Sequence, residues 1–254
     1  MIKEIQSVNN PYIKDLSKLK EKKYRNLNKR YIIEGYHLVK EAYLKKVLKE
    51  VLYINEIDIK DFNNTKVNLI KVNKEVINKL SDTTNPQNII GICEIKEVDV
   101  DYKDYNYLLI LDAINDPGNL GTLIRTALGF NIDLIVASND TVDLYNSKSI
   151  RATQGAMFAL PIIYKDLNLE IEKIKESGIK IIGTSLNAST TLKELNKLER
   201  YAIILGNEAR GVKENLLENT DVNVIIETNK LLESLNVSIA GAIMMYELNN
   251  KLSR

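Results

Sequence analysis

The sequence predicts an α/β protein whose C-terminal half contains a parallel sheet. Apolar segments that suit strands alternate there with segments of helical spacing. The run YLLILDAI at 107–114 is almost wholly apolar, as is typical of a strand that is covered on both faces. Three Asn-containing polar segments each follow a predicted strand, and parallel sheets bind ligands at the carboxyl ends of their strands. The sequence therefore predicts a ligand site built from these segments.

Length and composition indicate a folded chain with one locally basic region. The 254 residues allow one large domain or two ordinary ones, and 44% hydrophobic with 27% charged residues is typical of globular proteins. The formal net charge is only +1, but Lys14–Arg30 contains eight basic residues against two acidic ones. This region is either a solvated helix face or an arm that contacts phosphates, and the sequence leaves both readings open.

The single cysteine and the single histidine limit the chemistry. Cys93 cannot form an intrachain disulfide, and its surroundings, IIGICEI, indicate a buried structural thiol. His37 alone cannot build a metal site, and the sequence has no Cys/His cluster. No apolar run is long enough to span a membrane, and the first residues lack an apolar signal core. We therefore expect a cytoplasmic protein without a bound metal.

Residues 1–97 predict a small α/β domain with its own core. Apolar residues between Ile13 and Leu27 mark one short amphipathic helix with a lysine-rich outer face. The charged segment 98–106 suits a linker to a second domain, 107–254. In the first domain, strands are predicted at 31–33, 50–54, 67–72 and 89–95, and helices at 34–48 and 74–81.

In the second domain, strand–helix alternation implies parallel strands with right-handed crossovers. We expect a turn at 115–121, where Pro and Gly follow the first strand. Strands are predicted at 107–114, 134–138, 179–184, 201–205 and 222–226, and helices at 122–130, 147–158, 169–177, 212–218 and 234–246.

Two of the polar segments each contain a charged residue that is a candidate for a functional role. In NDPGNLGTLIRTALGF, Arg125 stands in an otherwise apolar helix, so we expect it to be buried and either ion-paired or functional. In IILGNEARGV, Glu208 lies between two glycines and before a helix. It could be a carboxylate near the helix N-terminus or the partner of Arg125.

The third segment, SLNVSIAGAIMMY, opens a largely apolar helix with polar residues. Ser234 or Asn236 is a plausible N-cap, because their side-chain oxygens accept from the first-turn amides. The alternative is contact with a ligand, since burying an unpaired amide costs roughly 2–7 kcal/mol. Three such segments at strand ends favour a shared ligand over separate caps.

Taken together, PGNLGTLIRTA, LGNEARGV and SLNVSIAGA resemble the three motifs of the SpoU (TrmH-like) branch of the SPOUT RNA methyltransferases. In the first domain, NPYIKDLSKLKEKKYR, RYIIEGYHLVKEA and SDTTNPQNIIG resemble the ribosomal-protein-L30-like, RNA-binding substrate domain of the rRNA-modifying members. The resemblance implies a SPOUT-type parallel sheet with a trefoil knot, a smaller N-terminal α/β substrate-binding domain, and a homodimer formed through the C-terminal domain.

The resemblance also implies the reaction. The cofactor would be S-adenosylmethionine and the acceptor a ribose 2′-hydroxyl in RNA, with rRNA favoured by the N-terminal domain. A tRNA substrate and a non-catalytic RNA-binding assembly or resistance factor remain alternatives. A dinucleotide-dependent oxidoreductase is disfavoured, because no G-x-G-x-x-G fingerprint is present.

The motif matches imply a role for individual residues. Arg125 would be the base that removes the hydroxyl proton, or a fixed cation, since a pKa above about 12 hinders an arginine base. The chain departs from the family pattern at Glu227 and Thr228 in the cofactor loop and at Asn88, where glycine is usual. The implied catalytic residues are Asn119, Arg125, Glu208, Ser234 and Asn236; the cofactor-binding residues are Thr184, Leu205, Gly206, Ile226, Leu235 and Asn236; and the RNA-binding residues are Lys14, Lys18, Lys22, Lys23, Arg25 and Arg30.

Overall fold

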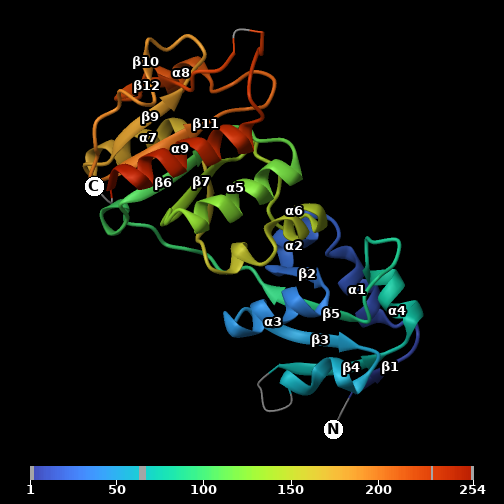
Figure 1. Cartoon of the computed structure of the whole chain (residues 1–254). Coiled ribbons are helices and arrows are strands. Elements are labelled where there is room, and N and C mark those ends of the chain that lie inside the picture. Colours follow the sequence, from blue (N-terminus) through green and yellow to red (C-terminus); the bar gives the residue numbers. More distant parts are fainter. Residues whose placement is uncertain (1–2, 63–66, 230, 253–254) are drawn as a thin grey trace. The chain divides into compact units, whose positions relative to one another are not determined.

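A computed structural model describes residues 3–62, 67–229 and 231–252 (Figure 1). The chain divides into two compact units. Unit 1 comprises Met1–Glu97 together with Asp143–Phe158, and unit 2 comprises Val98–Val142 together with Ala159–Arg254. The chain therefore passes from unit 2 into unit 1 and back again within its middle third.

Unit 1 is built on a five-stranded mixed sheet in the order β1-β4-β3-β5-β2. Strand β5 is antiparallel to both of its neighbours, and the other pairs are parallel. Apolar residues of the two outer helices α1 and α4 pack with sheet residues in one core. The strands are β1 (Lys3–Ile5), β2 (Arg30–Glu34), β3 (Leu48–Tyr53), β4 (Asn68–Val72) and β5 (Ile89–Glu94); the helices are α1 (Pro11–Lys18), α2 (Lys22–Asn28), α3 (Tyr36–Leu44), η1 (Glu56–Phe62), α4 (Lys74–Leu80), α6 (Ser147–Thr153) and η3 (Ala156–Phe158).

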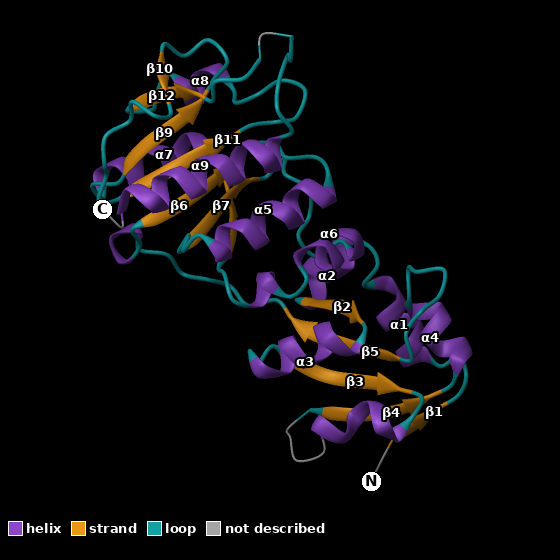
Figure 2. Ribbon diagram, in the orientation of Figure 1, coloured by secondary structure: helices purple, strands orange, loops and turns teal. Residues whose placement is uncertain are grey.

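Unit 2 contains a seven-stranded parallel sheet in the order β10-β12-β9-β11-β6-β7-β8, so the predicted parallel sheet is confirmed. Figure 2 shows α5 and α9 side by side on one face of this sheet and α7 on the other. The strands are β6 (Tyr107–Leu111), β7 (Leu134–Ser138), β8 (Ile162–Lys165), β9 (Lys180–Thr184), β10 (Thr190–Thr191), β11 (Tyr201–Leu205) and β12 (Val222–Ile225); the helices are η2 (Tyr102–Asp104), α5 (Pro117–Gly129), α7 (Leu167–Glu176), α8 (Glu214–Leu217) and α9 (Val237–Leu252).

Several predicted elements differ from the observed ones. The predicted turn at 115–121 is wrong from its third residue onward, because α5 already begins at Pro117. Proline suits the first helical position, where no amide donor is needed, and the Asp116 side chain caps the helix by accepting from the Asn119 amide at 2.7 Å. The helix predicted at 147–158 is interrupted at Gln154 and Gly155, which both have positive φ. Strands β1, β8 and β10 were not predicted.

The N-terminal helix also differs from its prediction, because it consists of α1 and α2 rather than one element. Leu27 is 74% exposed and does not belong to the core. The predicted linker 98–106 contains the short helix η2, whose Tyr102 is buried and donates its hydroxyl to Glu170 at 2.5 Å.

Candidate active site

Three of the predicted catalytic residues form one hydrogen-bonded chain at the carboxyl ends of the strands of unit 2. The Glu208 carboxylate, in the loop after β11, accepts from the Asn119 side-chain amide at 3.0 Å. Asn119 lies in the first turn of α5, and its Oδ1 accepts from the side-chain amide of Asn236 at 3.0 Å. Each residue comes from a different polar segment, so the structure brings the three segments together.

The Glu208 carboxylate also fixes the backbone that leads into α5. It accepts from the backbone amides of Asn115 at 3.3 Å and Asp116 at 3.2 Å. Partial burial raises the pKa of this carboxyl, but hydrogen bonds from Asn119 and from backbone amides outweigh that effect, and the pKa lies below its ordinary value. Glu208 is therefore an anion at neutral pH, placed where the free amides of a helix start favour negative charge.

Asn236 is both a helix cap and a member of this network. Its Oδ1 accepts from the Ser238 amide at 2.9 Å and the Ser238 hydroxyl at 2.6 Å, at the start of α9. Its side-chain NH₂ group donates to Asn119. The two readings of this segment are thus compatible for Asn236, because its oxygen caps the helix while its nitrogen faces the site. Ser234 is exposed and forms no hydrogen bond with a described residue.

Arg125 is exposed, so the prediction that it is buried was wrong. The buried residues of α5 form a stripe that includes Leu123, Ile124 and Ala127, and Arg125 falls outside it. Within the described part of the chain its guanidinium has no ion pair, and Glu208 is not its partner. Arg125 is consequently available to a ligand in solution.

The structure adds Asp112, which sequence reasoning missed, as an anchor of the Glu208 loop. This carboxylate is 1% exposed, and it accepts from the Lys213 backbone amide at 2.9 Å and lies 3.2 Å from Lys213 Nζ. Asn207, next to Glu208, donates to the Ala113 carbonyl at 2.8 Å. The signal in the sequence was an acidic residue at the end of the apolar run YLLIL.

Four of the six predicted cofactor-binding residues stand at three adjacent strand ends, because β9 pairs with both β11 and β12, and the other two, Leu235 and Asn236, directly precede α9. Thr184 ends β9, and its hydroxyl donates to the Ile204 carbonyl at 2.9 Å. Leu205 is buried at the end of β11, while Ile226 and Leu235 are half-buried. Such backbone ends with aliphatic side chains fit an adenosine group, whose ring packs on apolar surface while its edges bond to polar groups.

Gly206 is required by close packing of the chain on itself. A Cβ at this position would lie 2.1 Å from backbone atoms of Gly211 and Val212. Asn207 and Gly211 exchange two backbone hydrogen bonds of 3.0 and 2.9 Å, which fold the loop back directly after β11. Any side chain at Gly206 would displace this loop and Glu208 with it.

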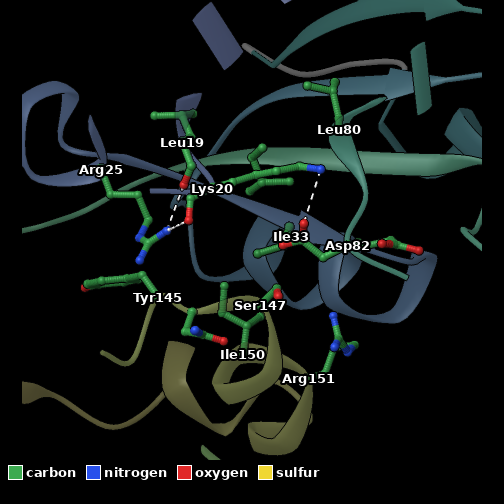
Figure 3. Close-up of a pocket in the computed structure, with 13 residues that line it drawn as sticks. Leu19, Lys20, Arg25, Ile33, Leu80, Asp82, Tyr145, Ser147, Ile150 and Arg151 are labelled. Atoms are coloured by element: carbon green, nitrogen blue, oxygen red, sulfur yellow. Dashed lines mark hydrogen bonds and ion pairs between the residues drawn. The ribbon is translucent and has the colours of Figure 1, made fainter. Parts of the chain in front are cut away.

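The predicted RNA-binding residues of unit 1 are exposed, with one exception. Arg25 is 5% exposed and bonds to Asp143 at 2.5 Å. Its guanidinium also donates to the carbonyls of Leu19 and Lys20 at 2.9 and 2.6 Å (Figure 3). We therefore remove Arg25 from the candidate RNA contacts and assign it a structural role. The cavity that Arg25 lines has a volume of about 60 Å³.

Neither the thiol of Cys93 nor a cluster of acidic and imidazole side chains supplies a second reactive centre in the described part of the chain. Cys93 is fully buried, and burial raises the pKa of its thiol well above the usual range. Among the described residues, no group of His, Cys, Asp and Glu side chains could hold a metal ion. None of the helices in the described ranges has the length and apolar content needed to cross a membrane.

We expect Glu208→Gln to lower the free energy of unfolding at pH 7 by about 1 kcal/mol, because an oxygen that accepts N–H groups becomes a donor at an exposed site. The depressed folded pKa means that the carboxylate stabilises above its unfolded pKa near 4.5 and loses this contribution as pH falls through the lower folded value. Urea unfolding at pH 7 and near pH 3 measures the difference. If the free energies of unfolding of wild type and Glu208→Gln differ by the same amount at pH 7 and near pH 3, the charge of Glu208 is not the cause of the lost stability.

Comparison with known proteins assigns the family. The SpoU rRNA methylase family model matches residues 106–246, and that of the MRM3-like substrate binding domain matches residues 10–91. The Bacillus subtilis protein named 23S rRNA (guanosine(2553)-2′-O)-methyltransferase RlmP is 36% identical over 249 residues, which are 97% of this chain and 99% of the relative.

Solved structures agree over nearly the whole chain. An AdoMet-bound rRNA methyltransferase from Sinorhizobium meliloti has a TM-score of 0.89 at 28% identity, covering 99% of this chain and 98% of that one. The SpoU methyltransferase AviRb from Streptomyces viridochromogenes, in complex with AdoMet, has the same fold, with a TM-score of 0.88 at 18% identity over 96% and 99% of the two chains. With its three motif segments joined at the strand ends and the family match spanning more than half of its length, this chain belongs to the SpoU rRNA methylase family.

Proposed function

We infer that this protein is an S-adenosylmethionine-dependent methyltransferase that methylates a ribose 2′-hydroxyl in rRNA. The observation that carries this function is the chain Glu208–Asn119–Asn236, which joins the three motif segments at the strand ends where parallel sheets bind ligands. The B. subtilis relative is named as an enzyme of this activity on 23S rRNA. A non-catalytic RNA binder would have no need of an ionised carboxylate that orients two side-chain amides.

The residues of the site would act by positioning rather than by forming a covalent bond. S-adenosylmethionine supplies a methyl group on a cationic sulfonium. Asn119 and Asn236 hold each other in one orientation, and Glu208 fixes the helix start that carries Asn119. Alignment of the hydroxyl with the methyl group can contribute much of the acceleration. Arg125 binds substrate phosphate and the hydroxyl, as a fixed cation or as the base.

We propose that the cofactor lies against the strand ends of β9, β11 and β12. Thr184, Leu205, Gly206, Ile226 and Leu235 would contact it, mainly through backbone and aliphatic groups. Support comes from the close turn at Gly206, which leaves no room for a side chain directly after the end of β11. Ser234 would join Asn236 at the methyl group, and the family's trefoil knot would place α9 beside α5 and β11, against which it packs.

Titration of the purified chain with S-adenosylmethionine, by calorimetry, tests the enzyme against a non-catalytic binder. We expect binding and competition by S-adenosylhomocysteine. Mapping of 2′-O-methyl groups in rRNA and tRNA, from cells with and without the protein, then identifies the substrate. The loss of one rRNA methyl group supports the proposal, the loss of a tRNA methyl group changes the substrate, and the absence of cofactor binding contradicts the function. With rRNA as the proposed substrate, we also propose that the protein acts in the cytoplasm.

We also propose that the protein is a homodimer through α9 and α5. Ile239, Ile243 and Tyr246 form an exposed stripe along α9, at 51%, 38% and 56% exposure, and Leu128 on α5 is 40% exposed. The Tyr246 ring packs edge-on against Phe130 at the end of α5, which joins the two helices into one surface. An exposed apolar stripe of this kind indicates a partner, and a second copy of this chain supplies the same stripe.

Ile243→Glu is expected to convert the dimer into a monomer, because a carboxylate would be buried without a partner at the centre of the stripe. Analytical ultracentrifugation measures the mass. Leu169→Glu is the matched control, since Leu169 is 61% exposed on α7 and should leave the dimer intact. A wild-type protein that sediments as a monomer at micromolar concentration would contradict the proposal.

We keep the domain limits as a proposal, with an RNA-binding domain at 1–97, a linker at 98–106 and a methyltransferase domain at 107–254. The substrate-binding domain match at 10–91 supports the first limit. Asp143–Phe158 lie within the second domain by sequence, but they pack in unit 1. The first domain would therefore include a segment from the second half of the chain.

A further inference from the structure

The second helix of unit 1 presents an aromatic ring among lysines. The Nζ atoms of Lys18 and Lys23 each lie 5.8 Å from the centroid of the Tyr24 ring, within the range of cation–π contact. Leu27 follows Tyr24 by three residues on α2, so the two side chains lie on the same side of the helix. We call Lys18, Lys23, Tyr24 and Leu27 the α2 platform.

The protein does not use the apolar side chains of the α2 platform in its own core. Leu27 is 74% exposed, and Tyr24 is partly exposed with a hydroxyl that bonds to no described residue. The side chain that α2 buries is Arg25, which lies between them in sequence and is held by Asp143. Burial of Arg25 thus turns the ring and the leucine toward solvent.

The charge around the α2 platform matches a polyanion. Among the described residues, Lys14, Lys22 and Lys23 have no ion pair, whereas Lys18 is paired with Asp15 at 2.8 Å. An unpaired lysine, Lys23, beside a partly exposed aromatic ring suits a single-stranded nucleic acid, since phosphates meet the cations and a base meets the ring.

We propose that the α2 platform stacks an unpaired base of the RNA substrate on Tyr24, with Leu27 at its edge and Lys22 and Lys23 at the neighbouring phosphates. The inference rests on the proposed function, because it takes RNA as the substrate. The base is unpaired, because in a duplex both faces of a base are covered by its neighbours. Stacking on one aromatic ring changes affinity on the order of 10- to 100-fold.

Fluorescence anisotropy with the full chain, a labelled single-stranded RNA and a duplex of the same sequence tests the stacking. Tyr24→Ala and Tyr24→Leu should weaken single-strand binding on the order of tenfold at every salt concentration, without changing the salt slope, while Tyr24→Phe binds like the wild type. Lys23→Ala should make the slope shallower by about 0.7. Leu44→Ala, at an exposed leucine on α3, is the control and should bind like the wild type.

Unchanged single-strand binding by Tyr24→Ala and Tyr24→Leu would overturn the stacking, as would equal weakening of duplex binding or failure of the wild type to bind the single strand. Unfolding midpoints of all variants show whether a loss of binding is a loss of folding. If Tyr24→Ala and Tyr24→Leu are unfolded, Tyr24→Phe decides: it keeps the ring, so weakened binding of the single strand by this variant would contradict the stacking. If methyl transfer persists while the stacking fails, the proposed function stands. If the wild type fails to bind S-adenosylmethionine, the function itself fails.

Discussion

Arg125→Ala is expected to bind S-adenosylmethionine like the wild type and to transfer methyl groups to RNA at least about 100-fold more slowly. Removing one preorganised group that stabilises developing charge typically costs about 10²–10³ in rate. Arg125 is exposed and makes no ion pair with a described residue, so its removal should leave the folded state intact. Single-turnover transfer of a labelled methyl group, alongside calorimetric cofactor binding, measures both quantities.

The control for this variant is Lys103→Ala, which removes an exposed cation of unit 2 before the start of β6, away from the strand ends of the site. It should retain the wild-type rate. A rise in KM alone in Arg125→Ala would assign the guanidinium to phosphate binding, and a fall in kcat alone would assign it to the hydroxyl. Full activity of Arg125→Ala would remove this residue from the mechanism.

Asp143→Ala is expected to lower the free energy of unfolding by about 3 kcal/mol, because it leaves the buried Arg25 guanidinium without its counter-ion. The side chains of this pair are only 6% and 15% exposed, and Nε of Arg25 already lacks a hydrogen-bond partner among the described residues. Urea unfolding followed by circular dichroism measures the change.

Two further variants test whether the lost stability comes from an unpaired buried charge. Asp15→Ala removes the exposed ion pair with Lys18 and should change stability little, since water screens that pair. The double variant Arg25→Met with Asp143→Leu replaces both charges by apolar groups and should recover much of the lost stability. An Asp143→Ala protein as stable as the wild type would show that water reaches Arg25 in its place.

The sequence predicted the meeting of the three polar segments because the geometry of a parallel sheet requires it. Strands that run in the same direction end at the same edge, so Asn119, Glu208 and Asn236 had to emerge close together. The direction in which a side chain points was harder to predict. Arg125 has apolar neighbours in sequence, but it lies outside the stripe that α5 buries.

Arg25 illustrates what sequence patterns cannot supply. Its neighbours on α1 and α2 are lysines on the surface, and nothing local distinguishes it from them. Its partner Asp143 is 118 residues further along the chain, and only the tertiary fold brings the two together. Likewise, the contact between the tilted rings of Tyr145 and Tyr31, with centroids 4.6 Å apart, depends on the return of the chain to unit 1.

The order in which the segments of the two units are synthesised affects how the chain folds on the ribosome. Unit 1 lacks Asp143–Phe158 until those residues emerge, by which time the first part of unit 2 has already been made. Strand β11, which joins β6 to β9 in the second sheet, is synthesised later still. At about 5–20 residues per second, several seconds pass before Asp143–Phe158 join unit 1 and before β11 completes the middle of the second sheet. We therefore expect the core of unit 1, which draws on residues between 5 and 92, to form early in translation, while the apolar surface of the unfinished second sheet needs protection until β11 emerges.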